Sequence, residues 1–289
     1  MTLDKEPGAI SLCCGDWTAT VFPSVGMNLA SLRCRGERIL REPDSLEMLR
    51  GNSVVYGNPI QLPNNRTHEG RFSFEGKEYT LPITEPAHNN NLHGDLHHSA
   101  FKVTGQGGDF VCGFYENKGE IYPFPFIAEV EIRLYEDRCE ETIRISNTGN
   151  GNMPFTFGLH TLFDEREVFS VPVSEHLELT EDFCPTGKRL PLNEMEQAFV
   201  AGTASRGKVI SGFYTLAGYE VTVGDTVFSV SDNFNCWVLW NQQGGMGFIA
   251  IEPQAGMSNA LNNGNGLMIL APGAEKAFRM TFSKKEVQV

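Results

Sequence analysis

The sequence predicts an all-β protein, a large antiparallel β-sandwich with few short helices. Two observations support this prediction: an alternation of apolar and polar residues with period two recurs along the chain, and helical periodicity is scarce. The 289 residues show no βαβ alternation, long linker, low-complexity tract or repeat of fixed period. We therefore expect residues 1–289 to form a single domain with one large core.

The clearest strand signal is in Ala128–Leu134, where every second residue is apolar and most of the others are charged. After the turn-like Glu136–Arg138, the alternation continues in Thr142–Ser146, and residues 147–152 are rich in types that tolerate positive φ. Phe72–Tyr79 is typical of a hairpin. Similar patterns predict further short strands at Thr18–Phe22, Glu220–Val223, Val227–Val230, Cys236–Trp240, Phe248–Ile251, Leu267–Leu270 and Ala277–Phe282.

Only two stretches favour helices. Leu192–Val200 is typical of a short helix and Leu46–Arg50 of a single turn. The glycine clusters Gly105–Gly108 and Gly264–Gly266 are spaced like hairpin turns. Neither cluster follows a strand and opens a helix, so we do not expect a phosphate-binding loop at either place.

Composition narrows the classes of partner. The net charge of −13 argues against nucleic acid or an anionic membrane as the main partner, since both attract basic patches. The N-terminal residues lack the apolar stretch of a signal peptide, and no apolar run approaches the length of a membrane span. Seven cysteines without framework-like spacing favour reduced thiols and a cytoplasmic location. The oligomeric state stays open.

Three side chains suited to proton transfer stand far apart in the sequence. His93 precedes a glycine, His160 lies in Pro154–Phe163, which is typical of an apolar strand, and Glu252 ends an apolar run just before a proline. Two imidazoles and a carboxylate suit acid–base catalysis at neutral pH if the fold brings them together. Each also has a structural interpretation, as a hydrogen-bonded histidine, a core histidine or the partner in a buried ion pair.

The densest polar segment, residues 57–98, includes Arg66 next to Asn65 after a proline-rich turn. The guanidinium offers a fixed fork of donors that suits hydroxyl groups, although a solvated loop would look the same. His93 and His97 have the spacing of metal ligands on one helix face. A zinc site is not expected there, because Gly94 weakens a helix and no cysteine or acidic cluster is near.

Other kinds of site receive less support. The sequence has no Gly-x-Ser-x-Gly motif for a nucleophilic serine, and the adjacent Cys13 and Cys14 lie in a strand-like segment that suggests packing. Trp237 and Trp240 are compatible with a stacking platform for a ligand and equally with the core of a sandwich.

Five groups of short motifs are distributed along nearly the whole chain. They are Gly57-Asn58-Pro59-Ile60 with Asn65-Arg66; Asn91-Leu92-His93-Gly94; Asn147-Thr148-Gly149 leading to Met153-Pro154-Phe155 and Gly158-Leu159-His160; Ile251-Glu252-Pro253-Gln254; and Leu270-Ala271-Pro272-Gly273. As an ordered set they resemble the aldose 1-epimerase family, also called galactose mutarotases. The resemblance implies a galactose mutarotase-like supersandwich whose open cleft binds a free aldose, without a metal or organic cofactor.

The resemblance also implies roles for individual residues. Glu252 matches the general base that takes the proton of the anomeric hydroxyl, and His160 matches the general acid that protonates the ring oxygen. His93 matches the second histidine near the reacting centre. Arg66, with Asn65 beside it, matches the arginine that binds ring hydroxyls. Ring opening, rotation about the C1–C2 bond and reclosure would then interconvert the α and β anomers of a hexose or related aldose.

This chemistry carries an expectation about protonation. A glutamate with an ordinary pKa of about 4.3 is ionised at pH 7, as a base must be. A histidine acid must hold its proton near neutrality, and a neighbouring carboxylate would raise the pKa of His160. We therefore expect Glu252 to be ionised and His160 to have a raised pKa.

Two features depart from the family pattern. Thr161-Leu162-Phe163 follows His160, where mutarotases tend to have a proline and an aromatic residue before the phenylalanine. The family's sugar-binding aspartate has no counterpart in Lys208–Tyr214, and neither Asp225 nor Asp232 can be assigned to its place. The sugar is therefore left open.

Two alternatives remain on the same fold. A hexose-6-phosphate 1-epimerase would need extra basic residues at the cleft, where Arg71 and Lys77 are the obvious candidates near Arg66. A non-catalytic carbohydrate-binding or sensor protein needs no matched acid and base, so the presence of both His160 and Glu252 argues against it.

Overall fold

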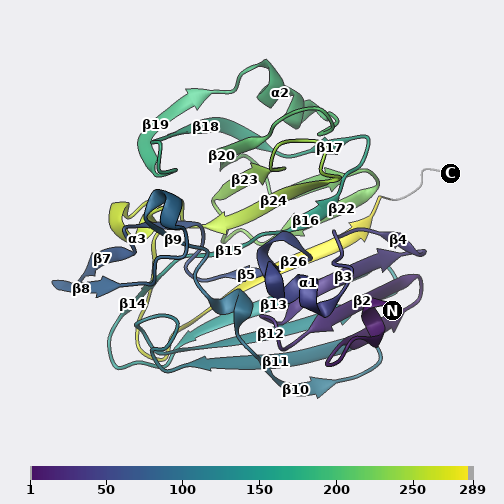
Figure 1. Cartoon of the computed structure of the whole chain (residues 1–289), viewed down its shortest axis with the longest axis horizontal. Coiled ribbons are helices and arrows are strands. Elements are labelled where there is room, and N and C mark those ends of the chain that lie inside the picture. Colours follow the sequence, from purple (N-terminus) through teal and green to yellow (C-terminus); the bar gives the residue numbers. More distant parts are fainter. Residues whose placement is uncertain (1, 286–289) are drawn as a thin grey trace.

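Three antiparallel sheets contain most of the strands in the computed structural model, which describes residues 2–285; Met1 and residues 286–289 of the expected domain lie outside the described part (Figure 1). Sheet I has the strand order β10 (Lys102–Gln106), β11 (Phe110–Asn117), β12 (Phe126–Leu134), β13 (Arg138–Asn147), β26 (Glu275–Lys284), β22 (Thr226–Val230), β21 (Glu220–Val223) and β17 (Phe169–Ser170).

Sheet II has the order β19 (Pro185–Pro191), β18 (Val173–Leu179), β20 (Ser211–Leu216), β23 (Cys236–Trp240), β24 (Phe248–Ala255), β15 (Phe157–Leu159) and β5 (Ile60–Gln61), and β16 (Leu162–Asp164) also pairs with β24. Sheet III contains β1 (Ile10–Cys14), β2 (Trp17–Phe22), β3 (Asn28–Cys34) and β4 (Glu37–Arg38).

Three two-stranded sheets complete the strand inventory of the described residues. They are β6 (Arg66–His68) with β9 (Asn90–Leu92), β7 (Arg71–Phe74) with β8 (Lys77–Thr80), and β14 (Met153–Phe155) with β25 (Met268–Leu270). The helices are short: α1 (Leu46–Gly51), α2 (Glu194–Ala201), α3 (Ala260–Asn263) and single 3-10 turns at Leu3–Lys5, Ser53–Val55, Pro86–His88 and Leu96–His98. Within residues 2–285, no helix has the length and apolar character needed to cross a membrane.

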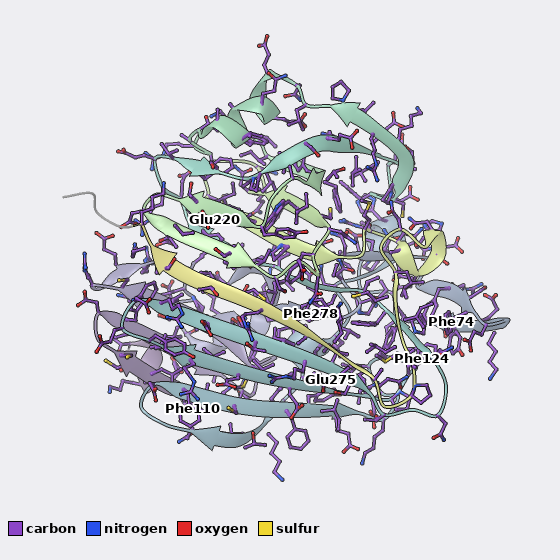
Figure 2. The ribbon with its side chains drawn as sticks, turned by 180° about the vertical axis from the view of Figure 1, so that it is seen from behind. Phe74, Phe110, Phe124, Glu220, Glu275 and Phe278 are labelled. Carbon is purple, nitrogen blue, oxygen red and sulfur yellow. The ribbon has the colours of Figure 1, made fainter. Side chains whose placement is uncertain are left out.

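Sheets I and II pack face to face across an aromatic core, as expected for a β-sandwich. Phe157 on β15 stacks on Phe278 on β26, with ring centroids 4.0 Å apart, and Phe228 on β22 packs against Trp237 on β23. Figure 2 shows Phe278 in the middle of β26. At the end of the molecule that carries the β7–β8 hairpin, Phe124 contacts Phe74 edge to face. The predicted all-β sandwich is confirmed.

The predicted strands and helices are present in the structure, and their ends are shifted. Thr142–Ser146 is the second half of β13, which begins at Arg138, inside the predicted turn. The helical stretches Leu192–Val200 and Leu46–Arg50 become α2 and α1. In α2, Asn193 accepts from the backbone N–H of Glu196 while the Glu196 carboxylate accepts from Asn193 N–H. This capping box satisfies two N-terminal N–H groups that would otherwise lack partners.

Three local predictions were wrong. Gly264–Gly266 does not close a hairpin; Gly264 adopts φ +72° and caps α3. The apolar stretch Pro154–Phe163 is three short strands, because the chain leaves β14, pairs as β15, and pairs again as β16. Such breaks interrupt the backbone ladder, which period-two patterning alone does not reveal.

Glu252 does not end its strand, because β24 continues through Pro253 to Ala255. The Ile251 N–H donates to Thr161 O on the side away from β23, and alternate N–H groups of a strand face the same side. The missing N–H of Pro253 therefore faces the gap between β16 and β15, where no ladder bond is lost. This gap explains why a central strand accommodates a proline.

One buried carboxyl was not anticipated from the sequence. Glu141 on β13 is fully buried, and its Oε2 accepts a hydrogen bond of 2.6 Å from Asn58 Nδ2. Its Oε1 has no partner among the described residues. Burial raises the pKa of Glu141 to about 8, so the carboxyl is neutral at physiological pH.

We predict that Glu141→Gln makes stability less dependent on pH. The folded protein keeps a proton on Glu141 up to pH about 8, whereas the unfolded chain loses it near pH 4.5. Wild-type stability from this group is therefore complete at low pH and falls by about 1.4 kcal/mol per pH unit between these values. Urea unfolding from pH 5 to 8.5 should show the variant gaining on wild type as pH rises. Exposed Glu129→Gln is the control, and parallel curves for all three proteins would contradict the prediction.

Candidate active site

All five residues proposed from the sequence line one cavity of about 350 Å³. The cavity lies over β23 and β24 of sheet II, with β6, β9 and the turn after β18 at its rim. Its lining comprises Asn52, Val54, Val55, Asn65, Arg66, Glu85, Leu92, His93, His160, Phe183, Ser211, Phe213, Val238, Trp240 and Glu252. The fold therefore brings together the five proposed residues, which are up to 187 positions apart, from Asn65 to Glu252.

Glu252 is held by amide side chains on its own strand and on the loop before β6. Gln254 Nε2 donates to Glu252 Oε2 over 3.0 Å, and Asn64 Nδ2 donates to Gln254 Oε1 over 3.0 Å. Asn64 also donates to the Gly256 carbonyl over 2.7 Å. These bonds occupy one carboxylate oxygen of Glu252 and leave Oε1 directed at His160, whose Nε2 lies 3.3 Å away.

His160 sits in the break between β15 and β16, where its backbone N–H donates to Pro59 O over 3.0 Å. The next residue, Thr161, is buried and donates to Asn58 Oδ1 over 2.6 Å. Asn58 in turn donates to Glu141, so a chain of buried hydrogen bonds anchors the segment that carries His160. Thr161, which stands where the family tends to have a proline, therefore has a structural role. A proline at this position could not donate this hydrogen bond, because it has no hydroxyl.

His93 reaches the same place through an unusual backbone. It adopts φ +66°, its N–H donates to Asn65 O over 2.7 Å, and Gly94 follows with φ +62°. A Cβ at Gly94 would lie 2.0 Å from Leu62 O, so glycine is required there. The ring of His93 packs edge to face on His160, with centroids 5.2 Å apart.

Arg66 on β6 forms a two-point ion pair instead of lying in a solvated loop. Its Nε and Nη2 donate to the two carboxylate oxygens of Glu85 over 2.8 and 2.7 Å. The guanidinium carbon lies 4.4 Å from the ring centre of Phe183, and Nη1 is 3.4 Å from Asn65 Oδ1. The Nη1 edge thus keeps N–H donors for a ligand while the charge is balanced by Glu85.

The protonation of the central pair differs from the expectation. Burial raises the pKa of Glu252 to about 8, against smaller lowering effects from Gln254 and Arg66. Burial lowers the pKa of His160 to about 4 and that of His93 well below its ordinary value. The expected rise at His160 was wrong, because burial removes the hydration that stabilises the charged form of the imidazole.

Opposite pKa shifts leave the pair with one shared proton. Between pH about 4 and about 8, Glu252 carries a proton and His160 is neutral. Moving this proton across the 3.3 Å contact produces ionised Glu252 and protonated His160, which is the arrangement that a base and an acid need. The proton count is therefore correct for acid–base catalysis throughout the neutral range.

Several lining residues were missed from the sequence. Glu85 lies 19 positions from Arg66, and Phe183 belongs to a turn without a recognisable motif. Trp240 lines the cavity, whereas Trp237 belongs to the core, so the two tryptophans that looked alike have different surroundings. In the segment where an aspartate was sought, Ser211 faces the cavity.

The remaining candidates lie elsewhere. Asp225 pairs with Lys284 at 2.7 Å, outside the cavity lining, and Asp232 is also absent from that lining. Nδ1 of His97 lies 2.8 Å from Ser53 Oγ, so His97 is engaged away from His93. All seven cysteines fall within the described residues, and none forms a disulfide.

A larger hollow of about 600 Å³ lies over β1–β3, and its chemistry is different. Arg33 and Glu42, its charged groups beside Asp4, are bonded to each other, and its described lining contains no histidine. Size alone would favour this hollow as the active site, but the matched acid and base line the smaller cavity.

Comparison with known proteins gives a consistent result. The family model described as aldose 1-epimerase matches residues 9–283. The Escherichia coli (strain K12) protein YihR is 26% identical, and the match covers 95% of this chain and 92% of YihR.

Solved structures share the fold at low identity. A galactose mutarotase-like protein from Clostridium acetobutylicum has a TM-score of 0.90 at 21% identity, with 96% of this chain and 95% of that chain covered. The GalM/aldose epimerase homologue from C. elegans has a TM-score of 0.80 at 16% identity, with 97% and 99% covered. The resemblance found from the motifs is confirmed: this chain belongs to the aldose 1-epimerase family.

Proposed function

We propose that this protein is an aldose 1-epimerase that interconverts the α and β anomers of a free hexose or related aldose. Glu252, His160, His93 and Arg66 would act together in catalysis. The observation that carries the proposal is the buried contact of 3.3 Å between His160 Nε2 and Glu252 Oε1 in a cavity that also contains Arg66. A pair that shares one proton suits a reaction in which one proton is taken and another is given.

In the proposed mechanism, Glu252 accepts the proton of the anomeric hydroxyl while His160 donates a proton to the ring oxygen. The C1–O5 bond breaks and leaves an open-chain aldehyde. Rotation about the C1–C2 bond presents the other carbonyl face, and reclosure returns both protons. The reaction needs proton transfer alone, so the proposal includes no cofactor. His93, packed on His160, would hydrogen-bond the sugar near the reacting centre.

Charge in the cavity supports an unphosphorylated sugar. Arg66 is the cation among the described lining residues, and Glu85 already balances its charge. Arg71 and Lys77, considered from the sequence as phosphate ligands, lie on the β7–β8 hairpin and do not line the cavity. A phosphate dianion would therefore lack the cluster of cations that usually binds it.

The proposal is tested by polarimetry across an aldose panel. Freshly dissolved α-D-glucose, α-D-galactose and other aldoses, together with glucose 6-phosphate, would be followed with and without purified protein. Accelerated relaxation of a free aldose supports the proposal. Relaxation at the uncatalysed rate for every sugar would overturn it, and faster turnover of the phosphate ester would favour a hexose-6-phosphate epimerase.

We predict that Glu252→Gln lowers kcat by about 10²- to 10⁴-fold, because the amide cannot accept the anomeric proton. Sugar affinity should change little, since the glutamine keeps the size of the side chain. Polarimetry measures turnover, and quenching of tryptophan fluorescence, with Trp240 in the cavity wall, measures binding. Glu129→Gln, on the exposed face of β12, is the matched control. Turnover close to wild type in Glu252→Gln would remove the glutamate from its assigned role.

We predict a bell-shaped pH profile of kcat/KM with limbs near pH 4 and pH 8. The form with one shared proton exists between the pKa of His160, about 4, and that of Glu252, about 8. Above pH 8 the pair loses its last proton, so activity should fall about tenfold per pH unit. Rates from pH 3 to 9.5 would be corrected for the uncatalysed reaction. A rate that keeps rising through pH 9 would contradict the shared-proton scheme.

A further inference from the structure

We propose that His68, Asp182 and Cys184 form a binding site for a divalent transition-metal ion, best suited to zinc, at the rim of the catalytic cavity. One ligand atom from each side chain, a ring nitrogen, a carboxylate oxygen and the thiol sulfur, lies within 4.8 Å of the other two. The proposal concerns metal binding and is independent of the reaction proposed for the cavity.

The three donors are brought together by contacts between two distant segments. His68 is the last residue of β6, and its backbone N–H donates to Asn259 Oδ1 over 3.1 Å. Asp182 and Cys184 belong to the turn between β18 and β19, and the Asp182 carbonyl accepts from Asn90 Nδ2 over 3.1 Å. Because Asn90 lies on β9, the partner of β6, this bond fixes the turn beside His68.

The turn itself is closed by hydrogen bonds that hold Cys184 in place. The Thr180 N–H donates to Cys184 O over 2.8 Å, and the Cys184 N–H donates to Thr180 Oγ1 over 3.1 Å. The Ser258 hydroxyl donates to the carbonyl of Phe183, between the two ligands, over 3.0 Å. The backbone of the site is therefore organised before any metal binds, which lowers the entropic cost of binding.

The spacing fits a tetrahedral metal after small side-chain movements. Zinc bonds of about 2.0–2.3 Å place neighbouring ligand atoms about 3.3–3.8 Å apart. His68 Nδ1 is already 3.5 Å from Asp182 Oδ2, and both side chains are more than 40% exposed. Closing the longest separation, at most 4.8 Å, requires movement of about 1 Å.

The donor set selects the class of metal. A thiolate and an imidazole favour zinc and neighbouring transition metals over Ca²⁺ or Mg²⁺, which prefer oxygen ligands alone. One thiolate and one carboxylate neutralise the two positive charges of Zn²⁺. His68 Nδ1 is buried and has no hydrogen-bond partner among the described residues, since its distance to Asp182 is too long for a good hydrogen bond.

A metal bound at this place would hold one part of the cavity wall, Phe183, in position. Phe183 lies between the two ligands Asp182 and Cys184, lines the cavity, and packs against the guanidinium of Arg66. Cross-linking the turn to β6 would fix Phe183 over Arg66. The metal would therefore have a structural role, and its binding to the folded state alone would raise Tm.

The competing interpretation is a His68–Asp182 ion pair beside an unrelated buried thiol. Measurements of metal binding distinguish the two interpretations, because only the metal site requires all three side chains. Protein freed of metal with a chelator would be titrated with zinc by calorimetry. A parallel titration with Co²⁺ would be followed by absorbance, since a thiolate bound to cobalt gives a charge-transfer band.

We predict one zinc equivalent per chain and a thiolate charge-transfer band with cobalt. Cys184→Ser should abolish the band, and both Cys184→Ser and His68→Gln should weaken zinc binding at least tenfold. His68 is partly exposed, so its variant tests the site without disturbing the core. Cys13→Ser removes an exposed thiol outside the site, and His98→Gln removes a histidine paired with Asp95 at 3.1 Å.

Both controls should bind zinc as wild type does. The proposal is overturned if wild type binds no stoichiometric zinc, if binding is unchanged in both Cys184→Ser and His68→Gln, or if Cys13→Ser removes it. Thermal unfolding of each variant without metal shows whether the fold is intact, and sugar turnover, measured separately, reports on the proposed reaction and not on the metal site.

Discussion

The structure of the candidate site depends on the burial of one acid–base pair, Glu252 and His160. Both side chains are almost inaccessible to water, and their reacting atoms lie 3.3 Å apart. Loss of hydration moves their pKa values in opposite directions, to about 8 and about 4. The pair therefore holds a single proton throughout the neutral range, and its two tautomers are the neutral pair and the ion pair. A solvated pair with ordinary pKa values would carry its proton on the histidine and lose it above pH about 6.5.

Amide side chains hold the segments that carry the two buried titratable groups. Gln254 and Asn64 form a chain behind Glu252, while Asn58 links the residue after His160 to the buried Glu141. Amides donate and accept without adding charge, so they orient the pair, and the Gln254 hydrogen bond lowers the pKa of Glu252 less than burial raises it. The sandwich makes room for this network through the break between β15 and β16.

The opposite wall of the cavity is organised by Arg66. Glu85 binds the Nε–Nη2 edge of its guanidinium and Phe183 covers one face, so the Nη1 side is left open. Phe183 in turn depends on the turn after β18, which hydrogen bonds attach to β9 and to Ser258. The position of the Arg66 guanidinium and the stability of this turn are therefore linked, and the proposed metal site at His68 lies beside the turn.

The sequence by itself determined the sandwich, most strands and the motif residues, because alternation is local and the motifs around His93, His160 and Glu252 are contiguous. It could not place Glu85, Phe183 or Cys184, since their partners lie many positions away and no local pattern marks the contact. The protonation states could not be predicted from the sequence either, because the direction of each pKa shift depends on how completely neighbouring elements exclude water. Only the tertiary structure decides that burial, because it is a property of all the packed segments together.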